Sequence, residues 1–403
     1  MSFRTCTLTS KGKNMDEIGQ IRTFMDELVA IRRDLHANPE LGMEEFRTSD
    51  IVARYLESLG IEVHRGIGGT GVVGVLRSGA GSRSIGLRAD MDALPMTEMT
   101  DHSFRSTVPG RMHACGHDGH TTMLLGAARH LATTKSFNGT INFIFQPGEE
   151  GCGGALAMLE DGLFERFPCD AIFGMHNQPG IDVGTFRIAP GSIAAGGAFF
   201  DITVTGKGTH AAHAEDGTDP VLTACHIVTA LQSIVSRNVS PYEASVLSVT
   251  RISGGDAYNV IPQTATIAGT ARFFSRETGQ FMEQAMKRVA QGVAAGFGAR
   301  AELDFRLLFA PTVNDPVQTA VMASAAAALV GEDKVDLDLK PELGSEDFSF
   351  MLEKVPGAYI LVGNGEGHSL HHPSYGFNDE CIPYGAALYA RLASQLSNQG
   401  PGQ

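Results

Sequence analysis

The sequence predicts a large α/β domain that is interrupted by a smaller α+β domain. Three observations predict this fold. Short apolar strands alternate with helical stretches up to residue 195, alternating strands with two helices follow from residue 196, and a buried strand of the first kind returns near residue 358. We therefore expect residues 1–195 and 310–403 to form the first domain, with a mostly parallel sheet and flanking helices. Residues 196–309 are expected to form the inserted domain.

Two helices are expected before the first strand. The first lies within residues 20–37 and is ended by Asn38-Pro39, and the second spans about 44–58 and ends near Gly60. The apolar residues that recur at helical spacing in the first are Phe24, Leu28, Ile31 and Leu35.

Strands and helices then alternate. Strands are expected at 71–76, 84–88, 140–145 and 171–175, and helices at 121–132 and 154–159. This alternation favours a parallel sheet with helices on its faces.

The inserted segment has a β-α-β-β-α pattern. Strands are expected at 199–204, 245–252 and 264–273, and helices at 220–235 and 281–297. Asp219 is the expected N-cap of the first of these helices, with Pro220 at its first position. A helix at 317–329 and a buried strand at 358–362 return the chain to the first domain.

Composition excludes several classes of protein. A formal net charge of -14 disfavours a nucleic-acid partner, and no apolar run is long enough to span a membrane. The N-terminus has no secretory pattern, and Met15 is an alternative start that would leave residues 1–14 outside the native chain. The six cysteines are scattered, so we expect free thiols and a cytoplasmic protein.

Metal-binding residue types follow several of the expected strands. Glu149-Glu150 follow the strand at 140–145, and His176 follows the strand at 171–175. Since ligands bind at the carboxyl ends of parallel strands, these side chains should converge. Further residues of these types stand before the helix at 121, namely His113, Cys115, His117, Asp118 and His120, and after the strand at 358–362, namely His368, His371 and His372.

The donor types indicate a transition-metal centre. Cys115 and His117 would point to one side of an extended segment, so both can reach one site. One thiolate, three imidazoles and one carboxylate exceed the needs of a single tetrahedral ion, which favours two adjacent ions. One carboxylate of the Glu149-Glu150 doublet can bind metal while the other acts as a general base.

At these motifs the chain resembles the dinuclear-metal peptidase and aminoacylase family, in its amidohydrolase branch. That branch includes hippurate hydrolases, auxin-conjugate hydrolases and N-acetyl-diaminopimelate deacetylases. The resemblance covers nearly the whole chain, in the expected order. Among the matching stretches are RRDLHANPELGMEE (32–45), GLRADMDALPM (86–96), MHACGHDGHTTMLLGAA (112–128), FQPGEEG (145–151), GKGTHAAH (206–213), GSEDFSFM (344–351) and LHHPSYGFNDE (370–380).

The resemblance implies a role for individual residues of the first domain. Glu149 becomes the general base, and Asp90 a residue that orients a ligand. His371 is chosen over His372 because His372 occupies the variable position of the family's Leu-His-x-Pro pattern. The implied metal ligands are Cys115, His117, Glu150, His176 and His371.

The resemblance also implies that the inserted domain is a lid that makes the dimer contact. His210 would polarise the scissile carbonyl, often from the partner subunit, and Asn259 and Arg272 would hold the substrate carboxylate. The chain departs from the branch at His213-Ala214-Glu215, where Met-Pro-His is usual, which leaves the acyl preference open.

These observations predict a metal-dependent amidohydrolase that cleaves an N-acyl amino acid or short peptide with metal-activated water. We expect two divalent ions per subunit, Mn²⁺ or Zn²⁺ with Co²⁺ and Ni²⁺ also fitting, and a homodimer or homotetramer. Three alternatives remain: a dipeptidase or N-carbamoyl amidohydrolase, a metal-binding protein without catalysis, and a thiol enzyme with Cys115 as nucleophile.

Overall fold

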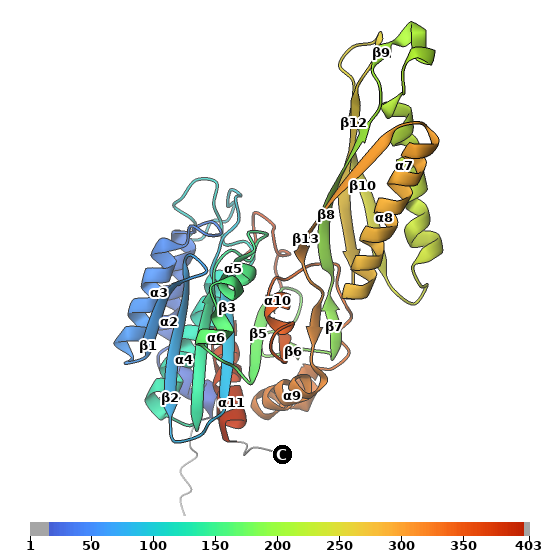
Figure 1. Ribbon diagram of the computed structural model, residues 1–403. Helices are drawn as coiled ribbons and strands as arrows, with labels where there is room; N and C mark the ends of the chain where they lie inside the picture. The colour runs from blue at the N-terminus through green and yellow to red at the C-terminus, as the bar shows by residue number, and fades with distance from the viewer. Residues whose placement is uncertain (1–15, 399–403) are drawn as a thin grey trace, which may run out of the picture.

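The computed structural model describes residues 16–398, which form two units, each built on its own sheet (Figure 1). We call them the large unit and the small unit. The sheet of the large unit has eight strands in the order β1 (Glu62–Ile67), β2 (Gly71–Ser78), β4 (Gly139–Gln146), β3 (Ser84–Asp90), β5 (Ala171–Gln178), β16 (Gly357–Gly363), β6 (Phe186–Arg187) and β15 (Val335–Asp336).

The predicted mostly parallel α/β architecture is confirmed. The four central strands β4, β3, β5 and β16 run parallel, while β2 and β1 extend the sheet antiparallel at one edge. The carboxyl ends of these four strands therefore meet at one edge of the sheet, where ligands bind in folds of this kind.

Helices cover both faces of the large sheet, because its central strands are apolar on both sides. Within β4, Phe143 and Phe145 pack into one hydrophobic core and Ile144 into the other. The first core includes residues of α1 (Glu17–Arg22), α2 (Met25–Ala37), α3 (Phe46–Ser58), α4 (His117–Thr134), α9 (Pro316–Val330) and α11 (Ile382–Asn398). The second includes residues of α5 (Gly154–Glu160), α6 (Leu163–Arg166) and α10 (Ser349–Leu352).

The small unit is an antiparallel sheet with helices on one face. Its strands lie in the order β10 (Ser245–Gly254), β12 (Thr264–Phe273), β8 (Gly196–Thr205) and β13 (Arg300–Phe309), and its helices are α7 (Pro220–Ser233) and α8 (Arg276–Gly296). Along β8, alternate residues such as Phe200 and Ile202 are buried under the helices, while Phe199 is exposed on the other face.

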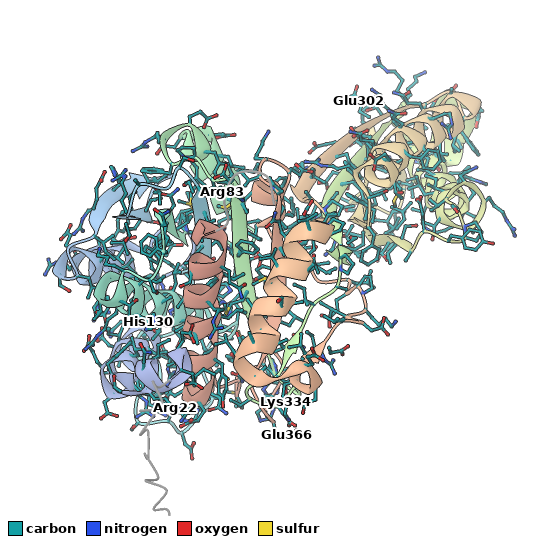
Figure 2. The ribbon with its side chains drawn as sticks, turned by 90° about the horizontal axis from the view of Figure 1, so that it is seen from below. Arg22, Arg83, His130, Glu302, Lys334 and Glu366 are labelled. Atoms are coloured by element: carbon teal, nitrogen blue, oxygen red, sulfur yellow. The ribbon has the colours of Figure 1, made fainter. Side chains whose placement is uncertain are left out.

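The far end of the small unit carries a second, two-stranded sheet. It pairs β9 (Thr209–His210) with β11 (Val260–Ile261), and a short 3₁₀ helix (Ala211–Asp216) follows β9. Figure 1 shows β9 at the tip of the small unit, well away from the large sheet. Figure 2, from below, shows the small unit projecting to one side, with the exposed Glu302 of β13 on it.

Two short strands connect the units. β7 (Gly191–Ala194) leads into β8 and pairs with β14 (Thr312–Asn314), which follows β13. The chain therefore enters and leaves the small unit through neighbouring strands. The small unit's sheet spans 196–309, the segment for which the sequence predicts the inserted domain.

Several predicted boundaries need correction. The helix expected from residue 121 begins at His117, and the strand expected to end at residue 175 extends to Gln178, so His176 lies within a strand. β13 was not expected, because its charged residues alternate along an edge strand and lower its mean hydropathy. The N-cap role of Asp219 is confirmed by its bonds to the Val221 and Leu222 amides.

Within residues 16–398, no helix has the length and apolar content that crossing a bilayer requires. The described cysteines are free thiols, of which Cys115 and Cys381 are buried and Cys152 and Cys225 are exposed. Cys6 and the proposed extension of residues 1–14 lie outside the described residues.

Candidate metal centre

Metal-ligand side chains from four segments meet at the carboxyl edge of the large sheet. Cys115 Sγ lies 3.3 Å from His176 Nε2, and His371 Nε2 lies 3.1 Å from Glu150 Oε1. Ligand atoms of Cys115, His117 and His176 lie within 4.8 Å of one another, and so do those of Cys115, Glu150 and His371. Cys115 belongs to both groups, so the five side chains form one continuous cluster.

The start of α4 places the first two of these side chains. Gly116, between Cys115 and His117, has a φ of 93°, which side chains other than glycine rarely tolerate. A Cβ at Gly116 would also lie 2.2 Å from the Asn177 Oδ1 atom. Glycine therefore lets the turn approach β5 closely, and this approach brings Cys115 to His176.

His117 has the geometry of a metal ligand whose orientation is fixed. Its Nδ1 donates a hydrogen bond to Asp92 Oδ1 at 3.1 Å, while its buried Nε2 has no hydrogen-bond partner among the described residues. Burial alone would lower the pKa of His117, but Asp90 and Cys115 outweigh it and raise the pKa well above its usual value. A cation at Nε2 would take the place of that proton.

His176 is also ready to bind a cation. Its Nδ1 donates to the Asn177 carbonyl oxygen at 2.7 Å, which leaves Nε2 facing Cys115. Burial, together with His120, holds the pKa of His176 well below its usual value, so the imidazole is neutral. A neutral imidazole is the form that binds metal.

His371 reaches the cluster from a strained loop. It follows β16 and has a φ of 62°, one of three non-glycine residues with positive φ among residues 16–398. Hydrogen bonds to Cys115 and Glu150 raise its pKa to about 10. Backbone strain of this kind is kept where the surroundings determine it, and here it turns the ring toward Glu150.

Glu149 lies beside the cluster but is held differently from Glu150. It is buried and accepts a hydrogen bond from the Asp347 amide at 3.4 Å. Burial and the charges of Glu346, Glu150 and Asp347 raise the pKa of Glu149 well above its usual value. A raised carboxyl pKa brings proton uptake toward neutral pH, as a general base requires.

A second layer of buried charge supports these residues. Arg88 is fully buried and donates to Asp90 Oδ2 at 2.8 Å, to Glu346 Oε1 at 2.9 Å and to Asp347 Oδ1 at 3.3 Å. Asp90 in turn accepts from His120 Nδ1 at 2.6 Å. Arg88 therefore offsets part of the negative charge that Asp90, Glu346 and Asp347 place near Glu149.

Asp92, rather than Asp90, hydrogen-bonds the candidate ligands. It accepts from His117 through Oδ1 and from the Glu150 amide through Oδ2 at 2.9 Å, whereas Asp90 Oδ2 lies 3.9 Å from His117 Nε2. Sequence analysis did not single out Asp92. The signal for it was present, because Asp90 and Asp92 are two residues apart and point to one side of an extended segment.

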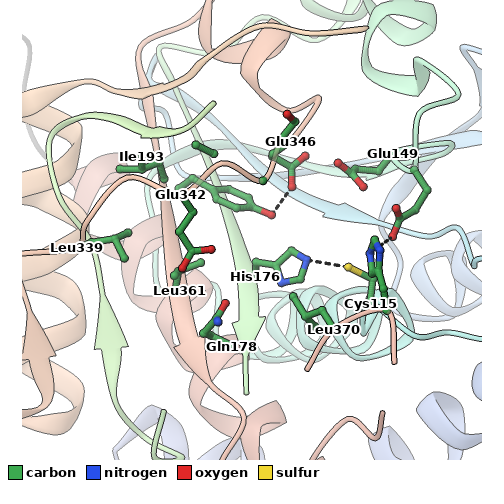
Figure 3. A pocket seen from close by; sticks show the side chains of 16 residues that line it. Cys115, Glu149, His176, Gln178, Ile193, Leu339, Glu342, Glu346, Leu361 and Leu370 are labelled. Carbon is green, nitrogen blue, oxygen red and sulfur yellow. Dashed lines mark hydrogen bonds and ion pairs between the residues drawn. The ribbon is translucent and has the colours of Figure 1, made fainter. Parts of the chain in front are cut away.

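The cluster lines one side of a cavity of about 370 Å³ (Figure 3). Cys115, Glu149 and His176 lie in its wall, and much of the rest is apolar. The apolar lining residues are Ile193, Ala194, Leu339, Leu361 and Leu370.

The predicted residues of the small unit are not gathered at this cavity. His210 is exposed in β9, and its neighbour Asn259 accepts a hydrogen bond from the Ala211 amide, so both lie at the tip. Arg272 lies near the end of β12 that is remote from the tip, where it pairs with Gly197 of β8. A Cβ at Gly197 would lie 3.1 Å from the Oγ of Ser345, which lines the cavity, and 3.4 Å from Arg272 NH1.

Comparisons with known proteins agree with this geometry. Residues 86–395 match the model of peptidase family M20/M25/M40. The chain is 41% identical to a hippurate hydrolase of Campylobacter jejuni over 94% of this chain and 99% of that protein. It is 40% identical to the IAA-amino acid hydrolase ILR1-like 4 of Arabidopsis thaliana over 92% of this chain and 86% of that protein.

A solved structure has the same fold. The YXEP protein of Bacillus subtilis, described as a dinuclear metal-binding peptidase from the M20 family, superposes with a TM-score of 0.83 at 35% identity. The match covers 93% of this chain and 99% of that protein.

Proposed function

The chain belongs to peptidase family M20/M25/M40 and is a metal-dependent amidohydrolase, and we propose that it hydrolyses the amide bond of N-acyl amino acids. The observation that carries this proposal is the placement of Glu149 beside a cluster of five candidate metal ligands, four of which line the same cavity as Glu149. A binding protein without catalysis has no need of a free carboxylate at that point. The relatives named for hippurate and IAA-amino acid hydrolysis suggest the class of substrate.

We propose Cys115, His117, Glu150, His176 and His371 as the ligands of two divalent ions. The donors fit such ions, because thiolate and imidazole suit transition metals and the buried His117 Nε2 has no hydrogen-bond partner among the described residues. Mn²⁺ and Zn²⁺ are the first candidates, and Co²⁺ and Ni²⁺ also fit this donor set. When bound, the ions would lower the pKa of a water molecule and polarise the substrate carbonyl.

Glu149 would carry the proton in this reaction. Its carboxylate takes a proton from the attacking water and delivers it to the amide nitrogen as the carbon–nitrogen bond breaks. The products are then a free carboxylic acid and a free amine. Asp347 and Glu346 keep the Glu149 carboxyl basic enough to accept the proton, since their charges raise its pKa.

The small unit would supply the remaining groups. Arg272 forms no ion pair with a described residue, and it lies beside Ser345 at the cavity wall, so its guanidinium suits the substrate carboxylate. His210 would donate to the carbonyl oxygen, and Asn259 would assist in holding the carboxylate. Because both lie at the tip, they would reach the cavity of a partner subunit rather than their own.

We further propose that the chain is divided into a catalytic domain and a lid domain. Residues 1–195 and 310–403 would form the catalytic metal-binding domain, and residues 196–309 the lid and dimerisation domain of a cytoplasmic homodimer or homotetramer. In this proposal Asp90 supports the site indirectly, because it accepts hydrogen bonds from His120 and Arg88.

The test is cleavage of N-acetyl, N-benzoyl and indole-acetyl amino acids by purified protein, with chelator and after adding Mn²⁺ or Zn²⁺. We expect cleavage that chelator abolishes and metal restores. Activity that survives complete metal removal would favour Cys115 as a nucleophile and contradict the proposal. Cleavage confined to dipeptides or N-carbamoyl compounds would assign the protein to those neighbouring activities instead.

A further inference from the structure

The cavity has a polar feature that the proposed reaction does not use. In Figure 3, Glu342 and Gln178 lie on the opposite side of His176 from Cys115 and Glu149. The apolar side chains of Leu339 and Leu361 lie close to them in the same view.

The backbone of Glu342 is fixed. Its amide donates to the Ile193 carbonyl at 3.0 Å, and its own carbonyl accepts from the Ala195 amide at 3.0 Å. These two bonds tie the segment to β7 on both sides of the residue. These backbone bonds hold the Glu342 Cα in a defined position, from which the side chain reaches the cavity.

Glu342 is exposed to solvent, and its carboxylate has no charged partner among the described residues. It forms no hydrogen bond or ion pair with any residue from 16 to 398, and neither does the Gln178 side chain. Glu346, also in the wall, contrasts with it, because Glu346 is held by Arg88 and by the Tyr359 hydroxyl. No lysine or arginine lines the cavity.

A carboxylate in an apolar wall discriminates by charge. A substrate group that ends in a cation or a hydrogen-bond donor gains a charge-assisted bond, while a group that ends in a carboxylate meets a like charge. Arg272 does not line the cavity, but its guanidinium lies near Ser345 of the wall, so a substrate that extends past Ser345 would meet a positive charge there and the negative charge of Glu342 within the cavity.

We propose that Glu342, with Gln178, selects substrates in which an apolar group ends in a positively charged or hydrogen-bond-donating tip. This inference rests on the proposed amidohydrolase function and names the chemistry of the group that fills the cavity. Two parts of an N-acyl amino acid can carry such a tip, the acyl group and the amino-acid side chain. Glu342 and Gln178 act here on specificity and not on the reacting atoms.

The experiment compares matched substrates in two series with metal-loaded full-length protein. The acyl series is N-(4-aminomethylbenzoyl)-, N-(4-ethylbenzoyl)- and N-(4-carboxybenzoyl)-glycine. The side-chain series is the Nα-acetyl derivatives of lysine, norleucine and glutamate. We expect kcat/KM to fall from the cationic to the neutral to the anionic member in one series, and that series identifies the part of the substrate in the cavity.

Variants then assign the preference to Glu342. Glu342→Gln should reduce the cationic-to-neutral ratio of kcat/KM by about 10-fold, the usual scale for losing one charged hydrogen bond. Glu342→Lys should favour the anionic member over the cationic one. Glu302→Gln, at an exposed carboxylate that lines no described cavity, is the matched control and should leave all ratios unchanged.

The outcomes separate this inference from the function on which it rests. Cleavage with no charge preference in either series, or ratios that Glu342→Gln and Glu342→Lys leave unchanged, would overturn the inference alone. Failure of metal-loaded protein to cleave any compound would overturn the proposed N-acyl amino acid hydrolysis, and the inference with it.

Discussion

The carboxyl edge of the large sheet and the tip of the small unit carry histidines in opposite settings. His117 is buried, with Nδ1 fixed by Asp92 and Nε2 turned into the ligand cluster. His210 is exposed, and its Nδ1 accepts a hydrogen bond from the Ala212 amide at 3.1 Å. The first histidine is preorganised by its own chain, whereas the second is not.

The two regions therefore differ in how firmly the chain holds the proposed site residues. At the large unit, hydrogen bonds and ion pairs within the chain, including those of Arg88, hold the buried charged groups beside the candidate ligands. At the tip, the His210 side chain is exposed and is held by one hydrogen bond, from the Ala212 amide.

Substitution of Glu149, the proposed general base, should have the largest effect. Glu149→Gln keeps the shape of the side chain but cannot accept a proton, so kcat should fall by about 10²–10⁴-fold or more. Metal content per chain should stay at the wild-type value, measured by elemental analysis. Glu302→Gln is the control, and a Glu149→Gln variant with wild-type kcat would show that another group takes the proton.

Substitution of His210 should lower kcat by about 10²–10³-fold, the scale for losing one donor to a developing oxyanion. Co-expression with Glu149→Gln tests whether His210 serves the partner subunit. In a mixed dimer, one site combines an intact Glu149 with an intact His210 from the other chain. Random pairing should then restore about one quarter of wild-type activity.

An absence of restored activity in that mixture, with mixed dimers verified by two affinity tags, would place His210 in its own subunit's site. In that case the tip of the small unit would have to move toward the cavity of the same chain, and the two regions would form one site within a single chain.

Asp92→Asn should weaken metal binding by about 10–100-fold, because Asp92 orients His117 and the Glu150 backbone together. The loss should appear as a higher metal concentration for half-maximal activity, with most of the kcat recovered at saturating metal. Asp101→Asn, at an exposed aspartate in a nearby loop, should leave metal affinity unchanged. An unchanged affinity in Asp92→Asn would mean that the ligands are held without this hydrogen bond.

The smallest effect concerns stability in a buried charge cluster behind the metal centre. His36 donates to Asp118 at 2.8 Å and to Glu98 at 3.3 Å. Burial lowers the pKa of His36, but Asp118 and Glu98 outweigh burial and raise it to about 9 from an ordinary 6.5. The charged imidazole therefore stabilises the folded protein fully below pH 6.5, and this contribution is lost as the pH rises through 9.

His36→Gln should lower the free energy of unfolding at both pH values. The decrease should be about 3 kcal/mol larger at pH 6 than at pH 9.5. Urea denaturation in the presence of chelator measures it without the contribution of bound metal. His64, half-buried beside Glu62, provides the control, and His64→Gln should change stability by only about 0.5 kcal/mol at either pH. An equal loss at both pH values in His36→Gln would show that His36 is neutral in the folded protein.

The sequence predicted most members of the candidate ligand cluster because the relevant residue types stand at the ends of helices and strands. Cys115, Glu150 and His371 were each identified beside a predicted strand or helix, and the structure brings them within 4.8 Å of one another. The sequence analysis did not identify Asp92 or Glu342. The roles assigned to these two residues rest on their contacts with residues distant in the sequence. The sequence also placed His176 after a strand, although the strand continues to Gln178.

The sequence by itself determined the α/β class, the inserted segment and the family, because apolar periodicity and local motifs are short-range properties of the chain. Only the tertiary structure showed which buried carboxylates pair with Arg88 and that His117 Nδ1 bonds Asp92 and not Asp90. It also placed His210 at the tip of the small unit, away from the cavity. These features depend on distances between residues remote in sequence, and electrostatic interactions depend steeply on distance and burial.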